Sequence, residues 1–90
     1  MKRLQAVFHG RVQGVGFRYT AEKLAQRFSV TGYVCNQENG TVELMVEGNE
    51  KELRELLKSI RSSHLALFIR NVDEVWSDAT NEWTRFGIRA

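Results

Sequence analysis

The stretch GRVQGVGFR, residues 10–18, determines the fold of the first part of the 90-residue chain. It contains three glycines and ends on Arg18. Residues 3–9 before it alternate between apolar and polar side chains, as a half-buried strand does. Apolar residues then recur at helical spacing after it. We therefore predict a strand, a glycine-rich loop and a helix that begins close to Arg18.

A glycine-rich loop ahead of a helix is a common way to bind an anion. Glycine allows backbone N–H groups to converge, and the helix dipole adds to the positive potential there. Arg18 would contribute a planar cation that matches phosphate oxygens. The loop alone is equally compatible with a tight turn beside a solvated arginine. It is not a Walker A loop, because Phe17 and Arg18 follow the last glycine where that motif has lysine and Ser or Thr.

The middle of the chain predicts a hairpin and a second helix. Residues 30–37 and 41–47 favour strands, and the Asn39-Gly40 dipeptide between them is typical of a hairpin turn. Asn49 can cap a helix, with Glu52 as its capping-box partner. The apolar stripe of that helix would be Leu53, Leu56, Leu57 and Ile60.

The last third predicts a loop and two strands. We expect a loop at residues 62–66, then strands at 67–76 and 83–89 around a polar turn at 77–81. The order is β-α-β-β-α-β with an extra C-terminal strand. It predicts an α+β fold, a ferredoxin-like split βαβ sandwich. Two helices would pack on one face of an antiparallel, mixed-order sheet of four to five strands, in one domain over residues 1–90.

Composition narrows the possible functions. Apolar residues make up 42% of the chain and the net charge is +2, which suits an anionic small molecule. No apolar run approaches the ~18–20 residues that span a bilayer. Residues 1–4 begin like a signal peptide, but Gln5, His9 and Arg11 interrupt an apolar core, so we expect a cytoplasmic protein. Cys35 is the only cysteine, which excludes an intramolecular disulfide and a CxxC zinc site.

Two motifs resemble those of the acylphosphatase family. Residues 10–18 look like the family's signature loop. Residues 32–36, GYVCN, followed by NGTV at 39–42, resemble the pattern G-[WYF]-V-x-N-x-x-D-G-x-V. Phe86-x-Ile88 resembles the family's closing strand, so the resemblance extends over essentially the whole chain.

This resemblance implies a specific activity. The chain would hydrolyse the carboxyl–phosphate bond of acyl phosphates to a carboxylate and inorganic phosphate, with no metal and no cofactor. Arg18 would bind the phosphate and Asn36 would orient the attacking water. The backbone amides of a phosphate-binding loop would hold the phosphoryl oxygens. That loop consists of Gln13, Gly14, Val15, Gly16, Phe17 and Arg18.

The same resemblance implies which partners to expect. We expect a small-molecule acyl phosphate as substrate and inorganic phosphate or sulfate as product or inhibitor. We expect a monomer that binds neither nucleic acid nor a membrane. RNA binding is disfavoured because strand 41–47 has no aromatic residue for base stacking and carries two glutamates. The alternative is a phosphate-binding module without turnover, like the acylphosphatase-like domain of hydrogenase maturation proteins.

Three positions depart from the family pattern. Asn39 stands where the family usually has Asp, and Cys35 stands where a basic residue often precedes the catalytic asparagine. Residues 62–66 lack the family's Gly-Pro segment. None of these positions is Arg18 or Asn36. We predict that Cys35 is a packed or partly exposed thiol rather than a nucleophile.

Other side chains are expected to be structural. We predict that His9 packs at the end of its strand and that His64 lies in a loop. Trp76 and Trp83 flank the last turn and are expected to pack against the fold.

Overall fold

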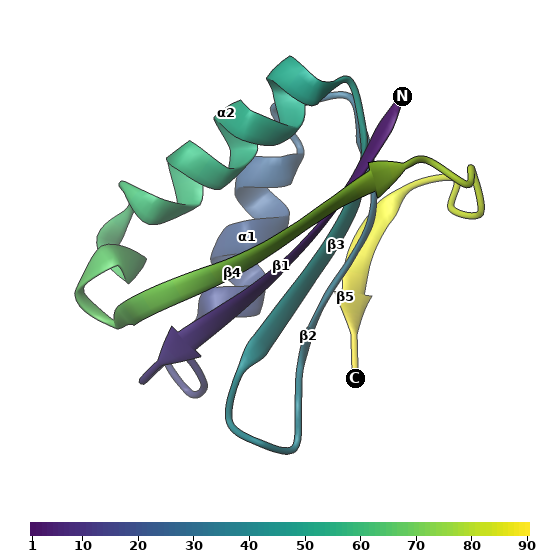
Figure 1. The fold of residues 1–90 in the computed structure, drawn as a ribbon. Coiled ribbons are helices and arrows are strands. Elements are labelled where there is room, and N and C mark those ends of the chain that lie inside the picture. The colour runs from purple at the N-terminus through teal and green to yellow at the C-terminus, as the bar shows by residue number, and fades with distance from the viewer.

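The computed structural model describes residues 1–90 and shows two helices against one face of a single sheet (Figure 1). This confirms the predicted α+β, ferredoxin-like architecture. None of the helices is both long and apolar enough to cross a membrane. The elements in chain order are β1 (Lys2–Gly10), α1 (Phe17–Ala25), β2 (Val30–Asn36), β3 (Val42–Gly48), α2 (Glu50–Arg61), the 3₁₀ helix η1 (His64–Leu67), β4 (Ile69–Asp78) and β5 (Phe86–Arg89).

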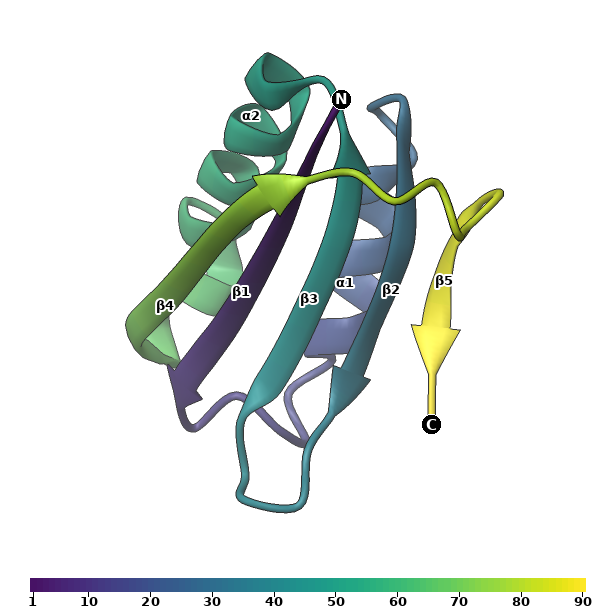
Figure 2. The same ribbon diagram turned by 45° about the vertical axis from the view of Figure 1, so that its right-hand side comes forward.

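The sheet has five strands in the order β4-β1-β3-β2-β5. All neighbouring pairs are antiparallel except β2 and β5, which are parallel. The strands on either side of the predicted turn at 77–81 therefore do not pair with each other. They lie at opposite edges, and the connection between them crosses the end of the sheet (Figure 2). β4 occupies the free edge of β1, which leaves the outer edge of β2 for β5.

The register of the central strands determines which residues form the core. In β1, Leu4, Ala6 and Phe8 pair with alternate residues of β3, and all three are fully buried. The residues that alternate with them, such as Arg3 and Gln5, point to the opposite face because side chains alternate along a strand. The helices complete the core with their apolar stripes. These stripes are Phe17, Ala21 and Ala25 in α1, and Leu53, Leu56, Leu57 and Ile60 in α2.

The predicted capping box of α2 was wrong. Asn49 occupies the N-cap position, but its side chain makes no capping hydrogen bond. The Glu52 carboxylate instead accepts a hydrogen bond from the Ser29 N–H at 3.0 Å. Ser29 immediately precedes β2, so this bond joins the first turn of α2 to the start of a strand. The Glu52 carboxylate therefore bonds to a backbone N–H outside the helix, and the capping box within α2 does not form.

Residues 62–69 also differ from the predicted loop and strand. His64–Leu67 form the helical turn η1, so His64 lies in a helical turn rather than in a loop, and β4 begins only at Ile69. The Ser63 hydroxyl accepts from the Leu65 N–H at 3.1 Å and donates to the Ile60 carbonyl at 2.7 Å. Leu65 is fully buried against the core. This serine cap and the buried leucine shape the segment in place of the Gly-Pro sequence.

A buried carboxylate holds the connection that leads to β5. Glu47 lies on the sheet face without helices and is 4% exposed. It accepts hydrogen bonds from Arg3 Nε at 2.8 Å, the Thr80 N–H at 2.8 Å and the Asn81 N–H at 2.9 Å. Burial raises the pKa of Glu47, but the bonds from Thr80, Arg3 and Asn81 outweigh it and the pKa lies below its usual value. The ionised form is therefore the one that the fold stabilises.

We predict that Glu47→Gln lowers the free energy of unfolding by about 2–4 kcal/mol at pH 7, because an amide cannot accept from all three donors. The folded pKa lies below the unfolded one, so the unfolded chain binds the proton first on acidification. The contribution is complete above about pH 4.3 and is lost as the pH falls through the folded pKa. Urea unfolding at pH 7 and at pH 3 measures both effects.

The control for this experiment is Glu50→Gln. Glu50 is exposed and pairs with Arg54 on the surface of α2, so its loss should cost less than about 0.5 kcal/mol. Equal destabilisation by the two variants would show that Glu47 has no special role.

Candidate active site

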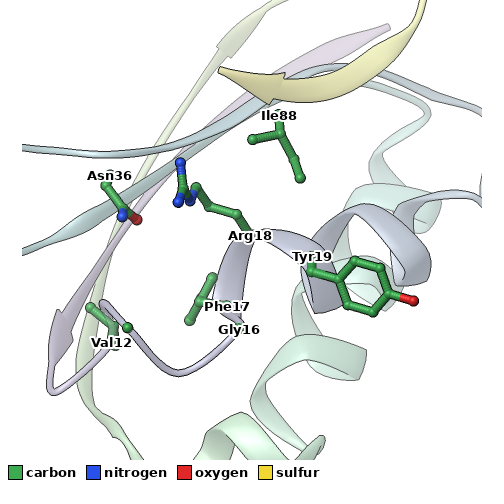
Figure 3. Close-up of a pocket in the computed structure, with 8 residues that line it drawn as sticks. Val12, Gly16, Phe17, Arg18, Tyr19, Asn36 and Ile88 are labelled. Atoms are coloured by element: carbon green, nitrogen blue, oxygen red, sulfur yellow. The ribbon is translucent and has the colours of Figure 1, made fainter. Parts of the chain in front are cut away.

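A cavity of about 270 Å³ opens where the glycine-rich loop enters α1. Its walls come from residues 10–16, the first turn of α1, the end of β2, and β5 (Figure 3). It brings Arg18 and Asn36, from the two sequence motifs, into one site. The lining residues are Val12, Gly14, Gly16, Phe17, Arg18, Tyr19, Asn36 and Ile88.

Two glycines shape the loop that directly precedes α1. Gly14 has φ 77° and Gly16 has φ 80°, in the left-handed region that side chains disfavour. A Cβ at either position would meet no atom within 4 Å, so backbone conformation rather than crowding requires glycine. Gly16 is also the N-cap of α1 and supplies no side-chain acceptor. The first N–H groups of α1 therefore form a positive helix terminus next to the cavity.

Arg18 and Asn36 both present unused polar groups to this cavity. Arg18 lies in the first turn of α1, and no carboxylate lies within 4 Å of its guanidinium. Asn36 is the last residue of β2, and both side chains are half-buried. Neither side chain takes part in a hydrogen bond within the protein. In Figure 3 the guanidinium extends toward the Asn36 amide.

Such an arrangement favours a small oxyanion. A permanent cation, a helix N-terminus and glycine amides all supply positive potential, and no acidic residue lines the cavity. No group of three or more His, Cys, Asp or Glu side chains is placed to share a metal ion.

The side chain of Gln13 has a role that the sequence did not reveal. Gln13 does not line the cavity, although it belongs to the predicted phosphate-binding loop. Its Nε2 donates to the Gln37 carbonyl at 2.7 Å and to the Thr41 carbonyl at 2.9 Å. Those two residues close the β2–β3 hairpin through the Gln37 N–H to Thr41 carbonyl bond at 2.9 Å. Gln13 thereby joins the glycine loop to the turn that follows Asn36.

Val15 also lies outside the cavity lining and packs, partly buried, against the core. The other four residues of the predicted loop, Gly14, Gly16, Phe17 and Arg18, do line it. Val12, Tyr19 and Ile88 line it as well, which the sequence reasoning did not anticipate. Tyr19 and Ile88 stand out as lining residues only by their exposure, and the exposure of a side chain cannot be read from the sequence.

Cys35 and His9 lie away from the cavity. Cys35 is buried on the opposite face of β2, where its Sγ is 3.7 Å from Glu43 Oε1. Burial raises the pKa of the Cys35 thiol, and the Glu43 charge raises it further. This confirms that Cys35 is a packed thiol. His9 Nε2 lies 2.8 Å from Asp73 Oδ2 on β4, which agrees with packing at the strand end.

Comparison with known proteins gives a consistent result. A family model described as Acylphosphatase matches residues 4–88. The acylphosphatase of Salinibacter ruber is 39% identical over 88 residues, covering 98% of this chain and 93% of that protein. A crystal structure of acylphosphatase from Bacillus subtilis matches all of both chains with a TM-score of 0.92 at 29% identity. Full-length HypF in its phosphate- and nucleotide-bound form matches the whole chain over 12% of its own length, with a TM-score of 0.84 at 27% identity.

We predict that Gln13→Ala loosens both segments that Gln13 joins. The two carbonyls each keep one other donor, so the free energy of unfolding should fall by only about 1 kcal/mol. Amide hydrogen exchange should become faster in residues 10–16 and in residues 37–41 together.

The matched control is Gln26→Ala at the end of α1, an exposed glutamine that should leave exchange in both segments unchanged. Faster exchange in the glycine loop alone would refute the bridging role.

Proposed function

The chain belongs to the acylphosphatase family, whose members are hydrolases of acyl phosphates, and on this premise we propose how its own residues carry out that reaction. The substrate is a small-molecule acyl phosphate, and the products are a carboxylate and inorganic phosphate. The observation that carries the proposal is the cavity in which Arg18 and Asn36 meet at the glycine-rich entrance to α1.

Arg18 and the loop amides are assigned to the phosphate. The amides are those of residues 13–18, and the guanidinium adds a fork that matches two phosphate oxygens. Phosphoryl transfer passes through a loose transition state whose charge is spread over the equatorial oxygens. Preorganised donors around those oxygens stabilise that charge more than they stabilise the ground state. The absence of any carboxylate from the cavity lining leaves this positive field uncompensated.

Asn36 is assigned to the attacking water. Its side-chain amide can donate and accept hydrogen bonds, but it is not a base. Its task is therefore to orient the water, whose proton leaves to a phosphate oxygen or to solvent. A carboxylate is a good leaving group and needs no strong general acid. Positioning and electrostatics are sufficient for this reaction, so neither a metal nor a cofactor enters the proposal.

The proposal extends to the setting in which the enzyme works. We assign it to the cytoplasm, where the free thiol of Cys35 would stay reduced, and treat it as a monomer that binds phosphate or sulfate as product or inhibitor. The likeness to a 12% segment of HypF supports one alternative, a phosphate-binding module without turnover. Hydrolysis of a synthetic acyl phosphate by the purified chain separates the two.

We predict that phosphate stabilises the fold through Arg18. At ~10 times its dissociation constant, phosphate should add about 1.4 kcal/mol to the free energy of unfolding. The increase in Tm should disappear in Arg18→Ala and should not return in Arg18→Lys, because an ammonium cannot replace the planar fork.

Potassium chloride at equal ionic strength is the salt control, and Arg27→Ala is the matched variant, since Arg27 is an exposed arginine beyond the end of α1. A phosphate effect that survives in Arg18→Ala would place the anion elsewhere.

We predict that Asn36→Ala lowers kcat by about 10²–10³, or about 3–4 kcal/mol, because one preorganised group that orients the nucleophile is lost. The inhibition constant of phosphate should change little, since the groups that bind phosphate remain. Steady-state kinetics and a melting curve on one preparation measure these quantities.

Asn39→Ala separates catalysis from hairpin structure. The Asn39 carboxamide oxygen accepts from the Thr41 N–H at 3.2 Å within the turn, so its loss should reduce stability while kcat of the folded protein stays near wild type. If Asn36→Ala behaves in the same way, Asn36 has only a structural role.

A further inference from the structure

A second hollow of the molecule, which shares no residue with the active-site cavity, is lined mainly by positive charge. It has a volume of about 300 Å³ and lies between the second half of α2 and β4, an edge strand of the sheet. Figure 2 shows α2 on the β4 side of the sheet, away from β5. Three of its side chains are cations and one is an acid, so this α2 groove attracts anions. The lining residues are Arg54, Leu57, Lys58, Arg61, Ser62 and Glu74.

The cations of α2 follow one side of the helix. They stand at positions 51, 54, 58 and 61, and spacings of three and four residues bring side chains onto the same face. Each helical residue rises about 1.5 Å, so Arg54 and Arg61 are about 10 Å apart along the helix axis. Leu57, which is buried, is the one apolar residue of the lining. The α2 groove therefore presents a row of positive charges rather than a single one.

Arg54 is held in place on two sides. Its guanidinium lies over the Trp76 ring, with Cζ 4.6 Å from the ring centroid, and its Nε donates to Glu50 at 2.9 Å. The guanidinium has no other hydrogen bond within the protein, so both terminal nitrogens are free to donate. A guanidinium fixed in this way has little rotamer freedom left to lose on binding, and its terminal nitrogens match two oxygens of one phosphate.

The other charges of the groove leave room for an anion. Lys58 has no carboxylate within 4 Å. Glu74 accepts a hydrogen bond from Trp76 Nε1 at 3.0 Å, and its second oxygen lies 3.9 Å from Arg61 Nη1. A long, exposed ion pair of this kind is weak, so Arg61 is available to a ligand as well.

We propose that the α2 groove binds a linear polyphosphate chain, at a site separate from the one that contains Arg18. A chain with a charge on every unit matches cations that extend over about 10 Å, whereas a single phosphate reaches only part of them. A volume of about 300 Å³ is at the small end of ligand pockets and suits such a chain better than a protein segment. Because Arg54 covers a face of the Trp76 ring, recognition rests on the phosphates and not on base stacking. Inorganic polyphosphate and the triphosphate of a nucleotide share this chemistry.

The test uses tripolyphosphate as the probe and Arg18→Ala as the background, because that substitution removes the cation of the active-site cavity. Calorimetric titration at about 0.15 M salt, which screens long-range attraction, should show one saturable site. Adding Arg54→Gln should weaken binding about 10-fold, and adding Lys58→Gln should weaken it about 3-fold. Arg54→Lys should not restore the affinity, because an ammonium lacks the planar fork.

Two further measurements locate the site. In two-dimensional NMR the Trp76 indole N–H and the amides of residues 54–62 should shift during the titration, whereas those of residues 13–18 should not. Arg27→Gln is the matched control, since it removes the same charge from an exposed position beyond α1 and should leave the affinity unchanged.

Four outcomes would overturn the proposal. Tripolyphosphate could fail to bind the Arg18→Ala protein, or Arg54→Gln and Arg27→Gln could weaken it equally, which would indicate unspecific attraction. Orthophosphate could bind as tightly, which would indicate a contact with one phosphate. A hexa-aspartate peptide could bind more tightly, which would indicate an acidic protein segment as the partner.

The source of the chain is decided by ATP. Binding of ATP at the same residues and with the same affinity as tripolyphosphate would support the proposal and include nucleotides among the ligands. Binding of tripolyphosphate without binding of ATP would support it for the inorganic chain alone. Neither result depends on the proposed function, because the probe binds without turnover at a site that shares no residue with the active-site cavity.

Discussion

Burial of the apolar side chains of β1 and β3 beneath the two helices fixes the face on which every other strand residue lies. Fully buried Leu44 pairs with Val34 of β2, so Val34 faces the helices. Alternation then places Cys35 on the opposite face and Asn36 on the helix side, next to Arg18. A slip of one residue between β2 and β3 would remove Asn36 from the site and bring the thiol there. The chemistry of the site therefore depends on core packing several residues away.

The same alternation keeps the two glutamates of β3 on the face of the sheet opposite the cavity. Glu43 and Glu47 are nearly buried, and both lie on the face without helices. Glu43 accepts hydrogen bonds from Gln5 at 2.7 Å and from the Tyr33 hydroxyl at 3.0 Å. Burial, together with Glu43, raises the pKa of Tyr33 to about 12, so this hydroxyl remains a donor at neutral pH. The acidic groups of β3 thus have their own partners on one face, and the cavity on the other face has no carboxylate in its lining.

Local patterns in the sequence predicted the elements well and the longer contacts poorly. Apolar periodicity and the Asn39-Gly40 turn placed β1, α1 and the β2–β3 hairpin, because each depends on neighbouring residues. The capping box at Asn49 failed because Glu52 bonds to Ser29, which is remote in sequence. The side-chain bonds of Gln13 and the placement of β5 at the far edge were missed for the same reason. Motifs brought Arg18 and Asn36 together, whereas the cavity position of Ile88 depends on how β5 is carried across the sheet.

The proposed phosphate end of the cavity and the exposed part of its lining are built in physically different ways, and this has consequences for how the protein can change. The phosphate end consists of backbone amides, two glycines at positive φ and one arginine, so altering it means altering the start of α1. Tyr19 and Ile88 in the lining are exposed side chains, and substitutions at exposed positions usually shift stability by less than about 0.5 kcal/mol. The proposed phosphoryl chemistry is therefore tied to the fold, and the exposed part of the lining is not. Substitutions at Tyr19 and Ile88 can change that part of the cavity without disturbing the register that holds Asn36 beside Arg18.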